Sequence, residues 1–392
     1  TGKLYMQVLN KERKGAYLGK TVQVIPHITD EVKDTIKKAG KISCSDVVIT
    51  EIGGTVGDIE AQHFLEGIRQ IRAEEGKENV LFVHVTLIPY LPKSEELKTK
   101  PTQHSCKELM SIGIIPDIIV ARTSLPLNEE IKKKISLFCN ISEKDVIENL
   151  DASSIYDVPM MFENQNVAQI IMKKLGLKET KNDLDTWYEL CKKKDNITDS
   201  VEIALVGKYV SLKDAYISIY ESLNHAGNFN NVDVKIRWID SEILEKEPVD
   251  KVLEGIDGVI VPGGFGNRGI DGKIAAIRYA RENKIPFLGL CLGMQLSIVE
   301  FARNVIGYND AHSVELNPDT RHPVIHLMPD QEGINDIGGT LRLGSYPCVL
   351  AKDSKAYELY GEETIHERHR HRYEVNNDYR KVLVENGMEL SG

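Results

Sequence analysis

PFLGLCLGMQLSIVEF, residues 286–301, joins a short apolar run to a helix-like segment through a single cysteine. In open α/β sheets, ligands gather at the carboxyl ends of strands, and Cys291 directly follows the run PFLGL. The pattern Gly289-Leu290-Cys291-Leu292-Gly293 places a glycine two residues away on each side. Small flanking residues permit a sharp strand-to-helix turn that holds a nucleophilic side chain out of the sheet. The stretch therefore predicts an α/β fold with an accessible thiol at the sheet edge.

Short apolar runs alternate with helix-like stretches over most of the chain. The runs outside the opening stretch are DVVIT (46–50), NVLFVHVTLIP (79–89), PDIIVART (116–123), VEIALVGKY (201–209), VDVKIRW (232–238) and DGVIV (257–261). This order predicts an α/β fold with mostly parallel sheets flanked by helices. Because the runs are nearly continuous in apolar residues, we expect most strands to be buried on both faces.

The chain length predicts two domains. At 392 residues, the chain exceeds the size at which a single core is usual. KETKNDLDTWYELCKKKDNITDS, residues 178–200, is charged and poor in aliphatic residues, which suits a linker with one short helix. We therefore predict domains at residues 1–177 and 201–392.

Composition excludes several classes of function. The formal net charge of −10 argues against a dominant nucleic-acid surface. The six cysteines are scattered without metal-ligand spacing, as expected in a reducing cytosol. No apolar run approaches the 18 or so residues of a membrane span, and the first residues lack a signal-like pattern. We expect a cytoplasmic protein whose partners are small molecules or proteins.

The surroundings of Cys291 favour chemistry at its sulfur. A helix that begins at Leu292 would direct unpaired amides at the sulfur and favour the thiolate. The glycines of VPGGFGNRG, residues 261–269, could turn a second amide toward a developing negative charge. A buried structural cysteine in a tight turn is the alternative.

The motifs of the second half resemble the class I glutamine amidotransferases. The similarity lies in PGGFGNRG, PFLGLCLGMQ, VEL around Glu315 and ERHRHRYEVN at residues 367–376. It implies that Cys291 attacks the amide carbon of glutamine, with an oxyanion hole from the Leu292 amide and that of Gly263 or Gly264. It also implies a set of residues that hold glutamine: Gly264, Leu292, Gly293, Met294, Gln295, Glu315 and Arg372. In that set a carboxylate would pair with the α-ammonium and a guanidinium with the α-carboxylate.

Acidic and basic motifs mark the first half. Glu51 ends the predicted strand of VVITEIGGTVGDIEAQ, residues 47–62, where a carboxylate is a natural magnesium ligand beside phosphates. Lys98, Lys100 and Lys134 would meet a triphosphate if the strand order brings their segments together. A hydrogen-bonded acid and solvated surface lysines are the alternatives.

Taken in order, the motifs of the whole chain resemble the CTP synthase family. They are KTVQVIPHIT (20–29), EIGGTVGDIE (51–60), KTKPTQHS (98–105), SSIYDVP (153–159), VGKY (206–209), VPGGFGNRG, LCLGMQ, GGTLRLG (338–344) and ERHRHRYEVN. The resemblance implies a P-loop, dethiobiotin-synthetase-like first domain and a flavodoxin-like glutaminase domain. It implies that ATP and Mg²⁺ activate O4 of UTP and that ammonia from glutamine then yields CTP, with GTP as activator and CTP as inhibitor.

The resemblance also assigns residues. It implies Glu51 as a magnesium ligand, Ala152 against ATP, Arg122 near the ammonia route and Arg268 in a lid on which GTP acts. The implied UTP and CTP contacts are Asp58, Ile59, Glu60, Lys98, Thr99, Lys100, Pro101, Thr102, Gln103 and Lys134. We expect a homotetramer with nucleotide sites at subunit interfaces, and the family also suggests filaments.

The chain departs from the family pattern at both ends. It shows neither a glycine-rich phosphate loop before Thr1 nor a His-Pro-Glu segment near Gly392. We therefore expect a fragment that makes no CTP on its own. The histidines of HERHRHR, residues 366–372, are expected on a solvated or substrate-facing surface, with a metal-binding or catalytic-base role as the less favoured alternative. Two alternatives stay open: a class I amidotransferase with another acceptor, and a non-catalytic nucleotide-binding or filament subunit.

Overall fold

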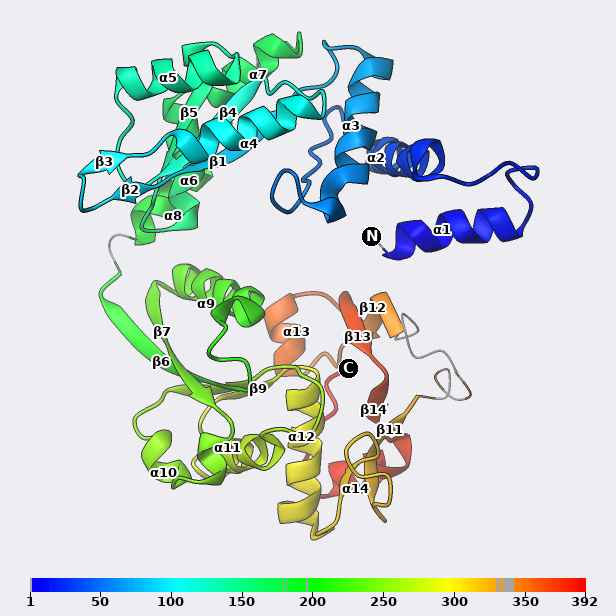
Figure 1. Ribbon diagram of the computed structural model, residues 1–392. Coiled ribbons are helices and arrows are strands. Elements are labelled where there is room, and N and C mark those ends of the chain that lie inside the picture. The colour runs from blue at the N-terminus through cyan, green and yellow to red at the C-terminus, as the bar shows by residue number, and fades with distance from the viewer. Residues whose placement is uncertain are drawn as a thin grey trace. The chain divides into compact units, whose positions relative to one another are not determined.

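The chain folds into two compact units, Thr1–Cys191 and Lys192–Gly392. The structure is a computed structural model (Figure 1), and it describes residues 2–178, 180, 182–194, 197–328, 331, 333 and 342–392. Each unit has its own parallel sheet, as the alternation of apolar runs predicts. Among the described helices, none has the length and apolar character needed to span a bilayer.

The sheet of the first unit contains three parallel strands. In the order β1-β4-β5, they are β1 (Val83–Ile88), β4 (Ile118–Thr123) and β5 (Val146–Leu150). Helices α4 (Lys100–Ser111) and α5 (Glu129–Cys139) contribute to the hydrophobic cluster on one face of this sheet. Helices α6 (Val158–Asn164) and α7 (Val167–Lys174) contribute to the cluster on the other face.

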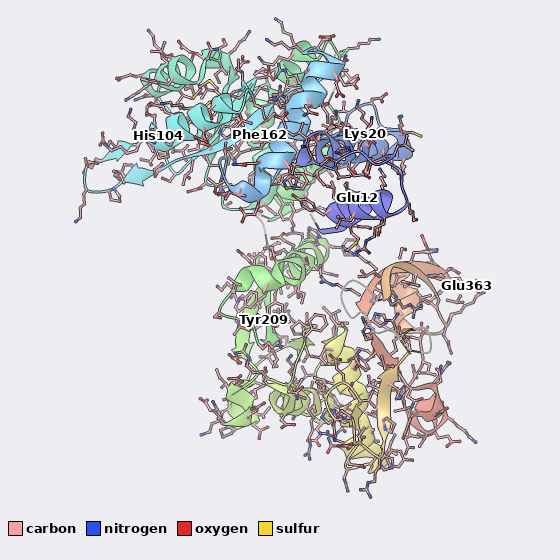
Figure 2. All side chains as sticks on the ribbon, turned by 45° about the vertical axis from the view of Figure 1, so that its right-hand side comes forward. Glu12, Lys20, His104, Phe162, Tyr209 and Glu363 are labelled. Atoms are coloured by element: carbon pink, nitrogen blue, oxygen red, sulfur yellow. The ribbon has the colours of Figure 1, made fainter. Side chains whose placement is uncertain are left out.

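The central strand β4 is buried on both faces. Its residues Ile119 and Ala121 pack among side chains of α4 and α5. Ile118 and Val120 pack on the opposite side, where Phe162 of α6 completes the cluster (Figure 2). The edge strand β1 differs, because its outward residues Val83, Val85 and Leu87 are exposed. The prediction of two-sided burial is thus confirmed for the central strand and wrong for the edge.

The predicted strand DVVIT is absent. Residues 46–50 adopt no regular structure, and Val47, Val48 and Ile49 are exposed. A strand needs a neighbour to satisfy its backbone groups, and within the described residues no segment pairs with this run. Glu51 therefore lies on an exposed loop and not at the end of a buried strand.

The remaining elements of the first unit are mostly helical. They are α1 (Gly2–Arg13), a π-helical turn (Val24–Ile28), α2 (Thr29–Ser43), α3 (Gln62–Glu75), α8 (Asp185–Lys194), the short strands β2 (Tyr90–Leu91) and β3 (Glu96–Leu97), and 3₁₀ turns at Ile59–Ala61, Glu143–Asp145 and Ile155–Asp157. The sequence analysis did not foresee α1 and α2. Helix α1 buries only Val8, so its apolar signal in the sequence is weak.

The main sheet of the second unit has the order β7-β6-β8-β9, with all strands parallel. The strands are β6 (Asp199–Gly207), β7 (Val232–Asp240), β8 (Gly258–Val261) and β9 (Phe287–Gly289). The chain steps from β6 to β7 and then crosses to β8 on the other side of β6. This is the flavodoxin-like order, as predicted, and its direction changes between β6 and β8.

Helices and a second set of strands complete this unit. The helices are α9 (Ile217–Asn230), α10 (Val249–Val252), α11 (Ile270–Glu282), α12 (Leu292–Phe301), α13 (Lys355–Tyr360) and α14 (Arg380–Glu385). Shorter turns lie at Lys213–Tyr216, Ile243–Glu245, Ala302–Ile306 and Asn377–Tyr379. Strands β10 (His312–Ser313), β11 (Pro323–Leu327) and β14 (Tyr373–Val375) form one small sheet, and β12 (Arg342–Val349) and β13 (Thr364–His371) form another. The sequence analysis had not resolved these small sheets.

Candidate active site

Cys291 occupies a sharp turn between β9 and α12. Its backbone has φ +53° and ψ −105°, which an L-residue rarely adopts and which costs about 1–3 kcal/mol. The Leu290 amide donates to the Val261 carbonyl at 2.9 Å, so the turn is tied to the neighbouring strand β8. Cys291 is exposed, as the glycine pattern predicts.

The two flanking glycines make this turn possible. A Cβ on Gly289 would lie 2.6 Å from the backbone nitrogen of Met294. A Cβ on Gly293 would lie 2.0 Å from the carbonyl oxygen of Val261. Both distances are shorter than any real contact, and the atoms in the way belong to the backbone. Only glycine at both positions lets α12 start this close to β8 and β9.

Three predicted partners of the sulfur lie next to it. A Cβ on Gly263 would be 3.4 Å from Cβ of Cys291 and 3.9 Å from its Sγ, so the glycine loop after β8 passes beside the thiol. The Leu292 amide donates a hydrogen bond to the sulfur, and the charge of Glu315 acts on it. The structure therefore brings together the candidate nucleophile, both candidate oxyanion donors and the candidate ammonium ligand.

The protonation of Cys291 differs from the expectation. Burial of the sulfur among protein atoms raises the pKa of Cys291 above the 9.0 of an ordinary thiol, although part of the residue is exposed. The Leu292 hydrogen bond lowers this pKa as predicted, but it is the smaller effect, and Glu315 raises the pKa further. The predicted effect of the helix amide is thus present, but burial outweighs it and the net shift favours the thiol. In the described part of the chain, no histidine is among the groups that act on the sulfur.

The carboxyl of Glu315 is also perturbed. Although much of this residue is exposed, the protein atoms around the carboxyl raise its pKa above the usual 4.5. A carboxylate with few polar neighbours gains most from a cationic ligand. Its position near Cys291 suits the α-ammonium group of an amino acid.

Sequence analysis missed a buried cation beside the glycine loop. Lys273 is fully buried, and no group among the described residues hydrogen-bonds to its Nζ. Burial, with the charges of Lys208 and Arg268, lowers the pKa of Lys273 to about 8. Its Nζ would lie 3.8 Å from a Cβ on Gly264, so a positive field adjoins the loop. No sequence signal distinguishes this lysine from a surface lysine in a helix.

The other predicted glutamine ligands have different surroundings. Gln295 is buried, and its Nε2 donates to the Tyr373 carbonyl at 2.8 Å. This bond ties α12 to the segment that carries Arg372, which is half-buried. Met294 is partly exposed on the first turn of α12. The Nε2 group of Gln295 is thus engaged with the residue that follows Arg372.

In the first unit, predicted residues gather at the carboxyl edge of the sheet. Arg122 lies near the end of β4, in register with Leu87 and Asn149, and is exposed. Ala152 follows the end of β5. Lys98 follows the β2-β3 hairpin, where its amide bonds to the Pro89 carbonyl at 2.9 Å. Because these strands are parallel, their carboxyl ends lie on one edge.

The predicted lysines occupy one corner of that edge. Lys98 pairs with Glu96, and this bond, with a smaller contribution from Lys134, lowers the pKa of Glu96. Lys100 lies over the Phe138 ring, with Nζ 5.7 Å from the centroid. Pro101 is exposed at the start of α4. Lys98 and Lys134 thus lie near the same carboxylate, while Lys100 lies over an α5 ring, and the anion-binding interpretation stays a prediction.

Three residues that were predicted to contact the pyrimidine nucleotide use their polar side chains for hydrogen bonds within the protein. Thr102 is fully buried, and its hydroxyl donates to Thr86 at 3.1 Å. Gln103 Nε2 donates to the Thr99 hydroxyl at 3.0 Å, and both residues are buried. Their side chains fix the start of α4 and do not face open solvent.

The acidic loop lies elsewhere in the first unit. Ile52 and Val56 pack against Leu109, near the far end of α4 from Lys100. A Cβ on Gly57 would lie 3.2 Å from Cγ of Glu108, and eight residues of helix separate Glu108 from Lys100 by about 12 Å. Glu51 and the exposed residues Asp58, Ile59 and Glu60 belong to this loop. Within one chain, the acidic loop and Lys100 thus lie near opposite ends of α4.

The remaining predicted residues lie near the glycine loop or outside the part of the chain that the structure describes. Arg268 is exposed and pairs with Glu242 at 3.4 Å, while its guanidinium also bonds to the Lys208 carbonyl. The first four residues of GGTLRLG lie outside the described residues.

Comparisons with known proteins agree over the whole chain. Residues 1–177 match the family described as "CTP synthase N-terminus", and residues 211–392 match "Glutamine amidotransferase class-I". A CTP synthase of Caldanaerobacter subterraneus subsp. tengcongensis is 58% identical over 391 residues, which are 100% of this chain and 73% of the relative. A CTP synthase of Clostridium beijerinckii is 57% identical over 392 residues, with the same coverage.

The chain belongs to the CTP synthase family. It contains both domains of a CTP synthase, and its function is that of this glutamine-hydrolysing ligase. The match of the first 177 residues favours CTP synthase over the alternative of a class I amidotransferase with another acceptor. Among solved structures, the glutaminase domain of Trypanosoma brucei CTPS with bound acivicin is 42% identical and covers 49% of this chain and 74% of its own, with a TM-score of 0.46.

The glycine turn of this CTP synthase homologue predicts a stability effect. Gly293→Ala would force a Cβ against the Val261 carbonyl, and we expect it to lower the free energy of unfolding of the second unit by at least about 3 kcal/mol. Urea unfolding followed by Trp238 fluorescence, in a Trp187→Phe background, measures this change. Gly264→Ala is the control, because its Cβ would meet Lys208 and Leu292 atoms at 3.6 and 3.8 Å. Equal stability of the two variants would contradict the proposed constraint.

The raised pKa of Cys291 predicts slow alkylation at neutral pH. Because less thiolate is present than in an ordinary cysteine, we expect iodoacetamide to modify Cys291 slowly at neutral pH and ever faster as the pH passes 9.0. Glu315→Gln removes a charge that raises this pKa, so it should speed the reaction at neutral pH. Mass spectrometry of the Cys291 peptide gives both rates. A rate that is already constant near neutral pH would show that the thiol is not held protonated.

Proposed function

We propose that the second unit releases ammonia from glutamine at Cys291 and that the first unit uses it to aminate UTP to CTP with ATP. The observation that carries this proposal is the turn that sets the Cys291 sulfur beside the Gly263 backbone, the Leu292 amide and Glu315. In this reaction the sulfur bonds to the amide carbon, and the C–N bond then breaks to release ammonia. Water hydrolyses the resulting thioester to glutamate.

The geometry gives each group a role. The amides of Leu292 and of Gly263 or Gly264 would bind the oxyanion, and the nearby Lys273 charge favours negative charge there. Glu315 would hold the α-ammonium and Arg372 the α-carboxylate. Bound glutamine would offset the Glu315 charge and so lower the pKa of Cys291 when the substrate is in place.

In the first unit, we place the nucleotides at the carboxyl edge of the sheet. Lys98, Lys100 and Lys134 would bind the phosphates of UTP or of inhibitory CTP, and Ala152 would lie against ATP. Ammonia would then replace the activated O4 of the uracil ring, with Arg122 near its route. Protonated ammonia is no nucleophile, so the transfer must be shielded from water.

Glu51 fits a magnesium ion by its chemistry. Its carboxylate is exposed on a loop with two glycines, and hard oxygen donors are the ligands that Mg²⁺ prefers. Bound there, Mg²⁺ would neutralise phosphate charge. Glu51 would orient the ion, and Gly53 and Gly54 would leave space for phosphates.

The acidic loop supports a homotetramer with shared sites. Asp58, Ile59 and Glu60 lie apart from the lysines within one chain, as expected if two copies complete one pyrimidine site. We further propose GTP activation through the loop of Arg268, a cytoplasmic location, and filament formation. Nucleic acid and membranes are not proposed as partners.

Replacement of the candidate nucleophile tests this function. In the protein at the full length of its curated relatives, Cys291→Ala should abolish glutamine-dependent CTP formation and leave formation from ammonium salts intact. Cys348→Ala, a change of another free thiol in the same unit, is the matched control and should keep both activities. CTP release is measured by chromatography. Glutamine-dependent synthesis by Cys291→Ala would remove this cysteine from the mechanism.

A further inference from the structure

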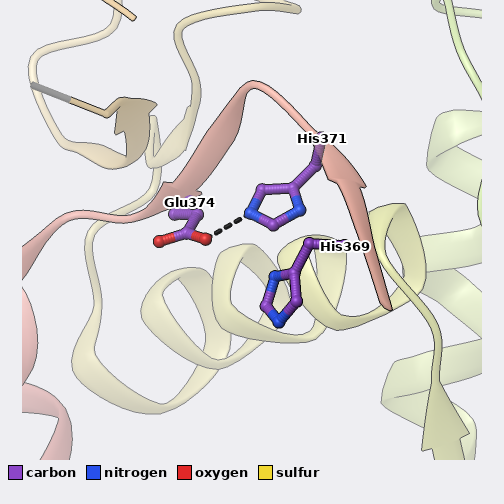
Figure 3. Close-up of side chains that lie close together, drawn as sticks. All are labelled: His369, His371 and Glu374. Atoms are coloured by element: carbon purple, nitrogen blue, oxygen red, sulfur yellow. Dashed lines mark hydrogen bonds and ion pairs between the residues drawn. The ribbon is translucent and has the colours of Figure 1, made fainter. Parts of the chain in front are cut away.

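Two histidines and a glutamate converge at the bend between β13 and β14 (Figure 3). One ligand atom from each of His369, His371 and Glu374 lies within 4.8 Å of the others, and all three residues are half-buried. His369 and His371 are two positions apart on β13, so their side chains leave the strand on the same side. The bend at Arg372 brings Glu374 of β14 back toward His371, and the two side chains are hydrogen-bonded.

Neighbouring side chains hold these three groups in place. The Tyr346 ring meets His369 edge-on at a centroid distance of 5.3 Å. Arg342 donates to the Glu374 carboxylate at 2.9 Å and lies over the Tyr346 ring at 4.1 Å. Metal ligands in proteins are oriented by such second contacts. The cluster is therefore more ordered than the solvated histidine run expected from the sequence.

Space is available next to His369. In the β12-β13 ladder, His369 lies opposite Gly344. A Cβ on Gly344 would meet no atom of the described residues within 4 Å. The position opposite His369 is thus open on the described side of the ladder, which leaves room for a water ligand.

We propose that His369, His371 and Glu374 form a binding site for a transition-metal dication of the zinc class, with water as the fourth ligand. Two imidazoles and one carboxylate are an established donor set for tetrahedral zinc. Tetrahedral ligands at about 2.0–2.1 Å from zinc lie roughly 3.4 Å apart, so the groups must move by only about 1 Å. The proposal does not rest on the proposed glutaminase mechanism, and its three ligands flank Arg372.

The site selects against hard cations. The guanidinium of Arg342 contacts the Glu374 carboxylate and repels any dication. A weak bond to the carboxylate oxygen alone would not offset this repulsion. Imidazole nitrogens bind Zn²⁺ and Co²⁺ strongly, whereas Mg²⁺ and Ca²⁺ prefer oxygen ligands. We expect Zn²⁺ to bind and Mg²⁺ not to compete.

Cobalt absorption tests the site in the 392-residue chain itself. Titration with Co²⁺ in the presence of a phosphine reductant should produce a saturable visible band at one equivalent, without the near-ultraviolet charge-transfer band of a cobalt–thiolate bond. Zn²⁺ should abolish the band and excess Mg²⁺ should not. This measurement on the unmodified chain needs no variant that might fail to fold.

Variants then assign the ligands. His369→Ala, His371→Ala and Glu374→Gln should each weaken Zn²⁺ binding, measured by competition with a chromophoric chelator, at least about tenfold. The matched control is His366→Ala, an exposed histidine of the same strand, which should bind like the unmodified chain. Thermal unfolding confirms that each variant is folded. The absence of a saturable band, a thiolate band, competition by Mg²⁺, or unchanged binding in folded ligand variants would each overturn the proposal.

Discussion

The close approach of the backbone at the start of α12 to the backbone of β8 and β9 determines the chemistry of this chain. Gly289 and Gly293 allow α12 to begin in contact with β8 and β9, and this contact forces Cys291 into a conformation with positive φ. The same contact places the loop of Gly263 beside the sulfur. The candidate nucleophile, its candidate oxyanion donors and a buried positive charge thus share one edge of a flavodoxin-like sheet, at the position that topology favours for ligands.

The pKa of the Cys291 thiol differs from that of a permanently activated thiol. Burial and Glu315 hold the pKa of Cys291 high, while the Leu292 amide opposes them. A cation that pairs with Glu315 would remove one of the effects that hold this pKa high. In the first unit, the acidic loop and Lys100 lie near opposite ends of α4, and this separation within one chain is the observation behind the proposal that two copies complete one pyrimidine site.

The sequence predicted those features that depend on local pattern. Alternating apolar runs indicated both sheets, and the glycine spacing around Cys291 indicated its turn, because backbone contact tolerates no other residue there. The direction in which folding shifts the pKa of Cys291 was not predictable, because burial raises this pKa while the Leu292 hydrogen bond lowers it. Lys273 has no sequence signal, since its burial follows from packing. DVVIT has strand propensity, but a strand also needs a partner.

A crystal structure of the chain after reaction with a chloroketone analogue of glutamine tests the central claim most directly. The account predicts a bond to Sγ of Cys291, with Cys291 still at positive φ and the ketone-derived oxygen bonded to the amides of Leu292 and of Gly263 or Gly264. It also predicts that the α-ammonium of the adduct lies beside Glu315. An adduct oxygen directed away from both amides, or a relaxed backbone at Cys291, would contradict it.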